Sequence, residues 1–158
     1  MIESIYNFRQ LSPTLATGGQ PDERELQAIC QAGFELVINL GLGDAPYAIA
    51  DEQSIIESRG LDYIHLPVSF EAPEIDQFHA FCRIFNIQRE RRAFIHCAAN
   101  KRVSVFMALF HVIEKDWAFT EARNTILSVW EPDAIWQVFI QQVLSTHSVM
   151  SKSSSESS

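Results

Sequence analysis

The sequence predicts an α/β protein with a mostly parallel central sheet and helices on both faces. Short apolar runs suited to buried strands alternate with longer stretches of helical periodicity, which is typical of parallel strands joined by helices. The strand-like runs cover residues 35–40, 61–66 and 94–97. In such sheets ligands bind beyond the carboxyl ends of the strands, and Cys97 stands at one of these ends.

Local signals predict the remaining elements. Residues 1–17 alternate loosely between apolar and polar and predict one or two edge strands. Pro21, the acidic residues after it and Gly33 frame a helix of about a dozen residues. The other helices are expected over residues 47–59, 73–89, 103–113, 120–129 and 132–144.

Length and composition indicate one domain. The chain has 158 residues and is 47% hydrophobic, which is enough for a substantial core. We expect residues 1–150 to form a single domain, with Trp130, Trp136 and Phe139 as core anchors. Residues 151–158 are nearly all serine and predict a disordered tail.

Charge and cysteine content limit the classes of function. A net charge of −8 argues against general binding to nucleic acid or to an anionic membrane. The three cysteines have no paired or metal-type spacing, which predicts a reduced, cytoplasmic setting. No signal peptide is evident, and the longest apolar run, residues 103–113, is too short to span a bilayer. The histidines lack metal-ligand spacing and no nucleotide-binding glycine pattern occurs, so we expect no metal and no cofactor.

Residues 93–104 are the strongest candidate for a chemical site. A buried strand ends there in a short loop that opens with Cys97 and leads into a buried helix. Such a turn directs backbone N–H groups and the positive end of a helix dipole at one point, which suits an anion and stabilises a thiolate. Among the nearby basic residues only Lys101 and Arg102 can reach the loop, since the others lie at the far end of the strand.

The loop resembles the phosphate-binding loop of the protein tyrosine phosphatases, in particular of their dual-specificity branch. The family pattern is His-Cys, five residues, Arg, then Ser or Thr, and His96-Cys97 begin it here. Ser104 matches the last position, but Val103 stands at the arginine position and Arg102 one residue earlier.

Three motifs resemble a bacterial subgroup, the phosphatase-like domain of unknown function associated with beta-lactamase-hydrolase-like proteins. They are Gly19-Gln20-Pro21, Val37-Ile38-Asn39-Leu40 and Cys97-Ala98-Ala99-Asn100. Asn100 replaces a glycine that the family often carries, and asparagine tolerates the left-handed conformation best after glycine. The resemblance covers roughly residues 5–145 and implies a tyrosine-phosphatase-like fold.

The resemblance also implies roles for the loop residues. Cys97 would be the nucleophile, His96 would orient the loop and Arg102 would clamp the phosphate. Ser104 would hydrogen-bond Cys97 and ease departure of the thiolate. The backbone of Ala98, Ala99, Asn100, Lys101 and Val103 would cradle the phosphate oxygens. Plainer alternatives remain open: a structural Cys97, an Arg102 and a Lys101 in solvent, and a Ser104 bonded to the backbone.

The family also uses a general acid, usually an aspartate on the loop after the preceding strand. Residues 67–73 form that loop here and contain no aspartate. Ser69 stands near its place, and Glu71 is the nearest carboxylate, either an acid or a charge at a helix start. Residues 130–133 resemble an acid loop superficially but follow the nucleophile, and we interpret them as a helix start with Pro132 first.

The leading hypothesis is a cysteine-dependent phosphatase that hydrolyses phosphomonoesters through a thiophosphate intermediate. Its phosphorylated substrate is a protein phosphotyrosine or phosphothreonine, or a small phosphoester. The alternative is a catalytically silent module that recognises phosphate, which the displaced arginine and the missing aspartate favour. A thiol redox sensor based on Cys97 is a third, weaker hypothesis.

Overall fold

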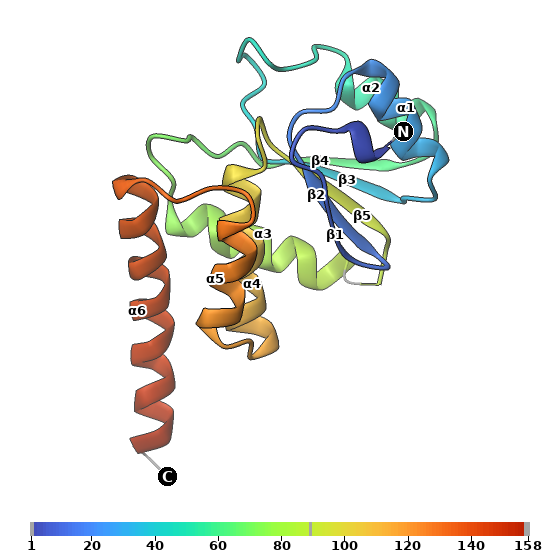
Figure 1. The fold of residues 1–158 in the computed structure, drawn as a ribbon. Helices are drawn as coiled ribbons and strands as arrows, with labels where there is room; N and C mark the ends of the chain where they lie inside the picture. Colours follow the sequence, from blue (N-terminus) through green and yellow to red (C-terminus); the bar gives the residue numbers. More distant parts are fainter. Residues whose placement is uncertain (1, 89, 157–158) are drawn as a thin grey trace.

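The computed structural model describes residues 2–88 and 90–156 and is built around a five-stranded sheet (Figure 1). The strand order is β1-β2-β5-β3-β4, and only the edge pair of β1 and β2 is antiparallel. The predicted mostly parallel sheet is thus confirmed. The strands are β1 (Arg9–Ser12), β2 (Leu15–Gly18), β3 (Leu36–Asn39), β4 (Asp62–His65) and β5 (Ala93–His96).

Helices cover both faces of the sheet, as predicted. In Figure 1, η1, α1 and α2 lie on one side of the strands, and α3, α4, α5 and α6 lie on the other. Each side has its own cluster of buried apolar residues, so the sheet is packed from both directions. The helices are η1 (Ile2–Ser4), α1 (Glu23–Gln31), α2 (Glu52–Ser58), α3 (Ile75–Gln88), α4 (Lys101–Lys115), α5 (Phe119–Leu127) and α6 (Ala134–Glu156).

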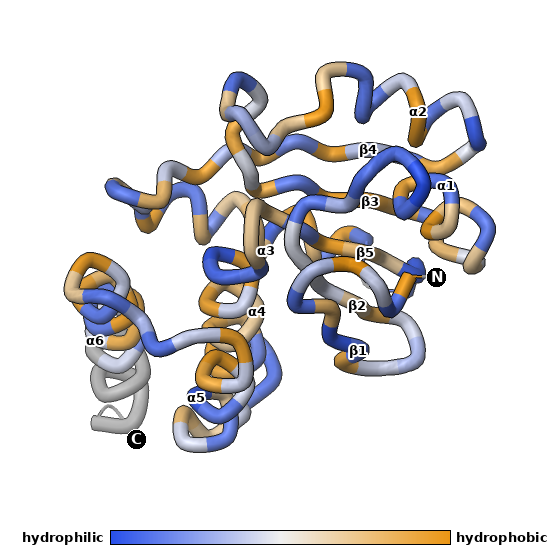
Figure 2. The backbone as a smooth tube through the Cα atoms, turned by 45° about the horizontal axis from the view of Figure 1, so that its top comes forward, coloured by the Kyte–Doolittle hydropathy of each residue, from blue (hydrophilic) through white to orange (hydrophobic). Residues whose placement is uncertain are grey.

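The two central strands, β3 and β5, are buried along their whole length. In Figure 2, β5 and much of α4 are coloured orange, the colour of hydrophobic residues. Of the expected anchors of the α-helical side, Trp136 and Phe139 are fully buried, whereas Trp130 is only partly buried. The apolar run that follows the candidate loop is therefore the central helix of the larger core.

Helix α1 begins at Glu23, later than the start at Pro21 that the sequence suggested. Asp22 rather than Pro21 marks its start, because its side chain accepts from the amide of Glu25 while Glu25 bonds back to the amide of Asp22. Gly33, past the end of the helix, has a φ of 91°, which explains the glycine there.

Two predicted helices differ in extent. Helix α2 is shorter than the predicted 47–59, because Tyr47 belongs to the preceding loop and uses its side chain in tertiary contacts. Helix α6 starts after Pro132 and extends through Glu156, beyond the predicted end at 144. The disorder expected for residues 151–158 stays a prediction, and residues 157–158 lie outside the described residues.

Within the described residues no helix has the length and apolar character needed to cross a membrane.

Candidate active site

The candidate loop, residues 97–100, joins the central strand β5 to the central helix α4 (Figure 1). Strand β5 pairs in parallel with β2 on one side and β3 on the other, so all three strands end at the same edge of the sheet. Cys97 is the first residue beyond β5 and is fully buried. The fold therefore places the thiol where parallel sheets bind ligands.

Asn100 sets the shape of the loop. It has a φ of 66°, in the left-handed region, and directly precedes α4. Its Nδ2 donates to Asn7 O at 2.8 Å and to Thr17 Oγ1 at 3.1 Å, and Asn7 Nδ2 donates to Ala99 O at 3.0 Å. Asn100 thus provides the turn expected of a glycine and fastens the loop to β2 and to the N-terminal segment.

Gly19 lets the β2 edge lie directly against the loop. A Cβ at this position would stand 2.7 Å from Ala98 O and 3.2 Å from Ala99 Cα, closer than side-chain atoms approach backbone. The following amide, that of Gln20, donates to Ala98 O at 2.9 Å. The glycine of the Gly19-Gln20-Pro21 motif is therefore explained by the loop that it supports.

Several backbone N–H groups at the loop are free for a ligand. Within the described residues, the amides of Ala98, Lys101, Arg102 and Val103 have no acceptor, and Ser104 is the first whose amide bonds inside the helix, to Asn100 O. These donors stand at the N-terminus of a helix of 15 residues. Donors so placed at the start of a helix have the chemistry that suits an oxyanion.

Arg102 is buried and does not extend into solvent. Its side chain is buried, with 4% exposed, and Nη1 donates to Val68 O at 2.8 Å while Nη2 donates to Tyr47 OH at 3.2 Å. Its Nε is buried and has no partner among the described residues. The guanidinium therefore connects the start of α4 with the loops that follow β3 and β4.

Val103, at the arginine position of the family pattern, is fully buried in the larger core. Successive residues of a helix point about 100° apart, so Val103 and Arg102 face different surroundings. The apolar side chain packs into the core, and the arginine one residue earlier takes the side of the loops.

His96 is held by a buried carboxylate that the sequence did not suggest. Its Nε2 lies 2.5 Å from Glu52 Oε2, and Gln20 Nε2 donates to Glu52 Oε1 at 2.7 Å. Burial alone would raise the pKa of Glu52, but the hydrogen bond and charge of His96, with donors from Gln20 and Tyr63, hold it below the ordinary carboxyl value. The Glu52 carboxylate thus orients the side chain of His96, the residue that precedes Cys97.

Ser104 bonds to the backbone, which is the plainer of the two alternatives left open by the sequence. Its hydroxyl donates to Lys101 O at 2.7 Å and accepts from Trp130 Nε1 at 3.1 Å. Because the hydroxyl has one proton, the expected hydrogen bond to Cys97 is not formed in this structure. A serine in the first turn of a helix commonly bonds back to the backbone in this way.

Aromatic residues surround the cation next to Arg102. Lys101 is partly exposed, and its Nζ lies 5.4 Å from the ring centroid of Trp130 and 5.9 Å from that of Phe70. Trp136 Nε1 donates to Phe70 O at 2.8 Å. The start of α6 thus anchors the loop expected to carry the acid at one point, Phe70.

The acidic candidates are placed less firmly. Glu71 is exposed, and its Oε2 accepts from Ser69 Oγ at 3.4 Å, at the limit of hydrogen bonding. Asp133 accepts from the amide of Trp136 and so caps α6, whereas Pro132 precedes the helix and was wrongly expected inside it. Residues 130–133 are therefore a helix start, as interpreted, and Glu71 remains the nearest carboxylate on the expected loop.

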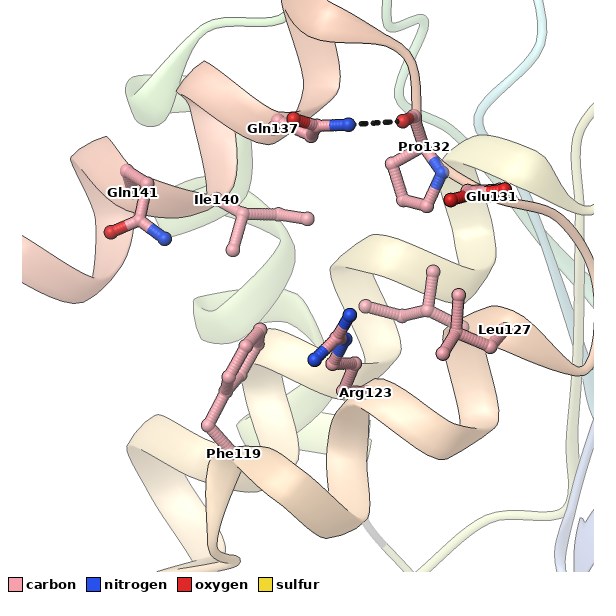
Figure 3. Close-up of a pocket in the computed structure, with 9 residues that line it drawn as sticks. Phe119, Arg123, Leu127, Glu131, Pro132, Gln137, Ile140 and Gln141 are labelled. Carbon is pink, nitrogen blue, oxygen red and sulfur yellow. Dashed lines mark hydrogen bonds between the residues drawn. The ribbon is translucent and has the colours of Figure 1, made fainter.

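A separate pocket of about 360 Å³ lies between α5 and α6 (Figure 3). Arg123 and Glu131 line it together with apolar side chains, and Gln137 Nε2 donates to Pro132 O at 2.8 Å. None of the candidate site residues lines this pocket. Glu131 thus lines a pocket that the candidate loop does not reach.

Comparison with known proteins gives one matching family. It is described as "DSP-PTPase phosphatase fused to NAD+ Kinase" and matches residues 6–131. No curated protein matches the chain in sequence.

Solved phosphatase structures share the fold. A candidate phosphatase of the DUF442 group from Shewanella putrefaciens CN-32 has a TM-score of 0.82 and 24% identity, covering 92% of this chain and 96% of that chain. The core catalytic domain of the PP-IP phosphatase SIW14 from S. cerevisiae, in complex with citrate, has a TM-score of 0.72 and 14% identity, covering 87% and 85%. TpbA from P. aeruginosa, in complex with pTyr, has a TM-score of 0.63 and 16% identity, covering 76% and 71%. The predicted tyrosine-phosphatase-like fold is thereby confirmed.

Proposed function

The chain belongs to the phosphatase family described as "DSP-PTPase phosphatase fused to NAD+ Kinase", and on this premise we propose that it hydrolyses phosphomonoesters through a thiophosphate intermediate on Cys97. The Cys97 thiolate attacks phosphorus, an S–P bond forms, and the P–O bond to the leaving group breaks. The leaving oxygen takes up a proton. Water then cleaves the S–P bond, which releases inorganic phosphate and restores the cysteine.

The observation that carries this proposal is the placement of Arg102. A phosphatase needs a cation beside the equatorial oxygens of the transferring phosphoryl group, where negative charge must be stabilised in the transition state. Arg102 is buried next to the free amides of the loop, and its Nε is a donor without a partner among the described residues. This geometry supports an arginine clamp in spite of the shift by one residue.

The loop amides and His96 have supporting roles in this mechanism. The amides of Ala98, Ala99, Asn100, Lys101 and Val103 face the phosphate oxygens, and His96, oriented by Glu52, keeps the backbone of the loop in place. Ser104 assists Cys97 only after its hydroxyl proton turns away from Lys101 O.

Glu71 is the proposed general acid. Protonation of the leaving oxygen contributes about 10² to 10⁴ in rate and matters most for poor leaving groups. Glu71 is exposed on residues 67–73, the loop on which the family carries its acid. Its weak anchoring suits an acid that is brought to the leaving oxygen only when a substrate is bound.

The proposed substrates are phosphotyrosine or phosphothreonine in proteins, or small phosphoesters. TpbA was solved with pTyr and SIW14 with citrate, so related folds accept oxyanion ligands of different size. The loop at residues 67–73 has no aspartate and is exposed at Pro67, Glu71 and Ala72, which supports an open site that several phosphoesters can enter.

A catalytically silent phosphate-binding module is the second candidate function. Two observations favour it: both terminal nitrogens of Arg102 are already bonded to Val68 and Tyr47, and no aspartate occurs on the acid loop. Such a module binds phosphate and does not turn it over.

Hydrolysis of para-nitrophenyl phosphate between pH 5 and 8 separates the two functions. This activated ester hardly needs a general acid, so it tests the nucleophile and the clamp. We expect Cys97→Ser to abolish turnover and Arg102→Ala to lower kcat/KM by about 10³ to 10⁵.

The matched controls are Cys30→Ser, at a half-buried cysteine, and Arg24→Ala, at an exposed arginine, and both should retain wild-type rates. A wild-type rate no higher than that of Cys97→Ser, with phosphate still bound, would overturn the enzyme proposal in favour of the silent module.

A further inference from the structure

Tyr47 has a place in the site that neither the family pattern nor its sequence surroundings suggest. It lies in the loop between β3 and α2, and its ring packs against Gly41. A Cβ at Gly41 would stand 3.1 Å from Tyr47 Cε1 and 3.3 Å from its hydroxyl oxygen. The glycine therefore makes room for the aromatic ring.

The backbone beneath Tyr47 is braced by both neighbouring strands. The amide of Gly41 donates to Asn39 Oδ1 at 2.8 Å, and His65 Nε2 lies 2.6 Å from Gly41 O. Asn39 ends β3 and His65 ends β4, so the loop is fixed to the carboxyl edge of the sheet, where Cys97 also lies. Tyr47 is thus held on a rigid support at the site.

The hydroxyl proton of Tyr47 is still available for a hydrogen bond. Its oxygen accepts from Leu42 N at 2.9 Å and from Arg102 Nη2 at 3.2 Å, which uses both lone pairs. The ring also faces the arginine, with Arg102 Cζ 5.9 Å from its centroid. The hydroxyl proton has no acceptor among the described residues, so a donor stands next to the guanidinium.

We propose that Tyr47 is a further phosphate-binding residue, whose hydroxyl donates a hydrogen bond to a phosphoryl oxygen held by Arg102. The inference rests on the proposed function, since both require an oxyanion beside Arg102. An oxygen that accepted from Arg102 Nε would lie beside the same guanidinium that Tyr47 OH contacts through Nη2. Tyr47 therefore adds a second side-chain donor where the family pattern provides the arginine alone.

The test compares wild type, Tyr47→Phe and Tyr6→Phe, a matched control at an exposed tyrosine. Binding of tungstate, a tetrahedral oxyanion, is measured by calorimetry, and hydrolysis of para-nitrophenyl phosphate is measured in parallel. A hydrogen bond to a charged group corresponds to a loss of about tenfold to a hundredfold when it is removed. We expect Tyr47→Phe to weaken tungstate binding and to lower kcat/KM by such factors, and Tyr6→Phe to match wild type.

A second comparison separates direct contact from support of Arg102. In an Arg102→Lys background, direct donation predicts that Tyr47→Phe still weakens tungstate binding by about the same factor. No further loss in that background would mean that Tyr47 acts only through Arg102, and the contact would be disproved.

The outcomes also separate this inference from the proposed function. Tungstate binding without hydrolysis, weakened by Tyr47→Phe, supports the Tyr47 contact and removes the enzyme proposal. If wild type turns over and Tyr47→Phe has the same kcat/KM and tungstate affinity, the Tyr47 contact is disproved and the proposed function stands. A wild type that binds no tungstate removes both.

Discussion

The floor of the site, residues 96–104, and its rim, residues 67–73, differ in burial and in bonding. On the floor, His96, Cys97 and Asn100 are fully buried, and His96 and Asn100 are tied to distant segments by short hydrogen bonds. On the rim, Glu71 is exposed and has one long hydrogen bond to its neighbour Ser69. Under the proposed function, the phosphoryl group would meet firmly held donors, whereas the acid would be held only weakly.

This difference separates binding of the phosphoryl group from protonation of the leaving group. Preorganised donors act on the phosphoryl group whichever ester carries it, whereas a loosely held acid matters in proportion to the basicity of the leaving oxygen. Changes on the floor should consequently affect every substrate, and changes on the rim should affect only poor leaving groups.

Asn100→Ala should have the largest effect among the supporting residues. Alanine at a φ of 66° costs about 1–2 kcal/mol, and two buried hydrogen bonds from Nδ2 are lost as well. We expect the free energy of unfolding to fall by about 2–4 kcal/mol and the affinity for phosphate to fall at least tenfold. Urea unfolding and phosphate titration measure these quantities.

Two variants check the cause of this loss. Asn100→Gly removes the same hydrogen bonds but accepts the left-handed backbone, so it should recover about 1 kcal/mol. Asn124→Ala, at an exposed asparagine of α5, should behave as wild type. Equal losses in Asn100→Ala and Asn100→Gly would show that the backbone conformation is unimportant.

Glu52→Gln should have an intermediate effect, mainly on stability. Glutamine keeps the shape but removes the charge that faces His96, and we expect a loss of about 1–3 kcal/mol at pH 7. Because the pKa of Glu52 is lowered in the folded protein, the ionised carboxylate stabilises the protein above the ordinary value of 4.5. This contribution is lost as pH falls further, so the difference from wild type should shrink below about pH 4.5.

Thermal unfolding of both proteins between pH 3 and 8 measures that convergence. Glu57→Gln, at an exposed position on the same helix, is the matched control and should follow wild type throughout. A difference between wild type and Glu52→Gln that stays constant down to pH 3 would contradict the ion pair.

Glu71→Gln should have the smallest effect on an activated ester and a larger one on a poor leaving group. With para-nitrophenyl phosphate we expect less than about threefold loss in kcat, and with an alkyl phosphate about 10². Glu74→Gln, at an exposed glutamate after the same loop, is the control. Equal losses on both esters would remove Glu71 as the acid and erase the contrast between floor and rim.

The main elements of the fold could be predicted because each has a local signal. The apolar run of β5, the buried α4 and the glycine after α1 are visible in the sequence without knowledge of any partner. The left-handed turn at Asn100 was expected from the family resemblance, because the family often carries a glycine at that position. The side of α4 on which Arg102 lies could not be decided, because it depends on Val68 and Tyr47 in other segments.

Two features of the site were missed for the same reason. Glu52 and His96 are separated by 44 positions, and no local pattern marks a glutamate at the start of a short helix as buried. Tyr47 was placed in a helix because its neighbours have helical periodicity, whereas its contacts with Leu42 and Arg102 hold it in a loop. Tertiary contacts override local propensity at such positions.

The most direct test of the account is rapid acid quenching of the wild-type enzyme during turnover of an aryl phosphate, followed by peptide mass spectrometry. We expect one phosphoryl group attached to Cys97 in the wild type. We expect no phosphorylated peptide from Cys97→Ser, or from wild type without the phosphate ester. Turnover that persists in Cys97→Ser, or a phosphoryl group found on another residue, would contradict this expectation.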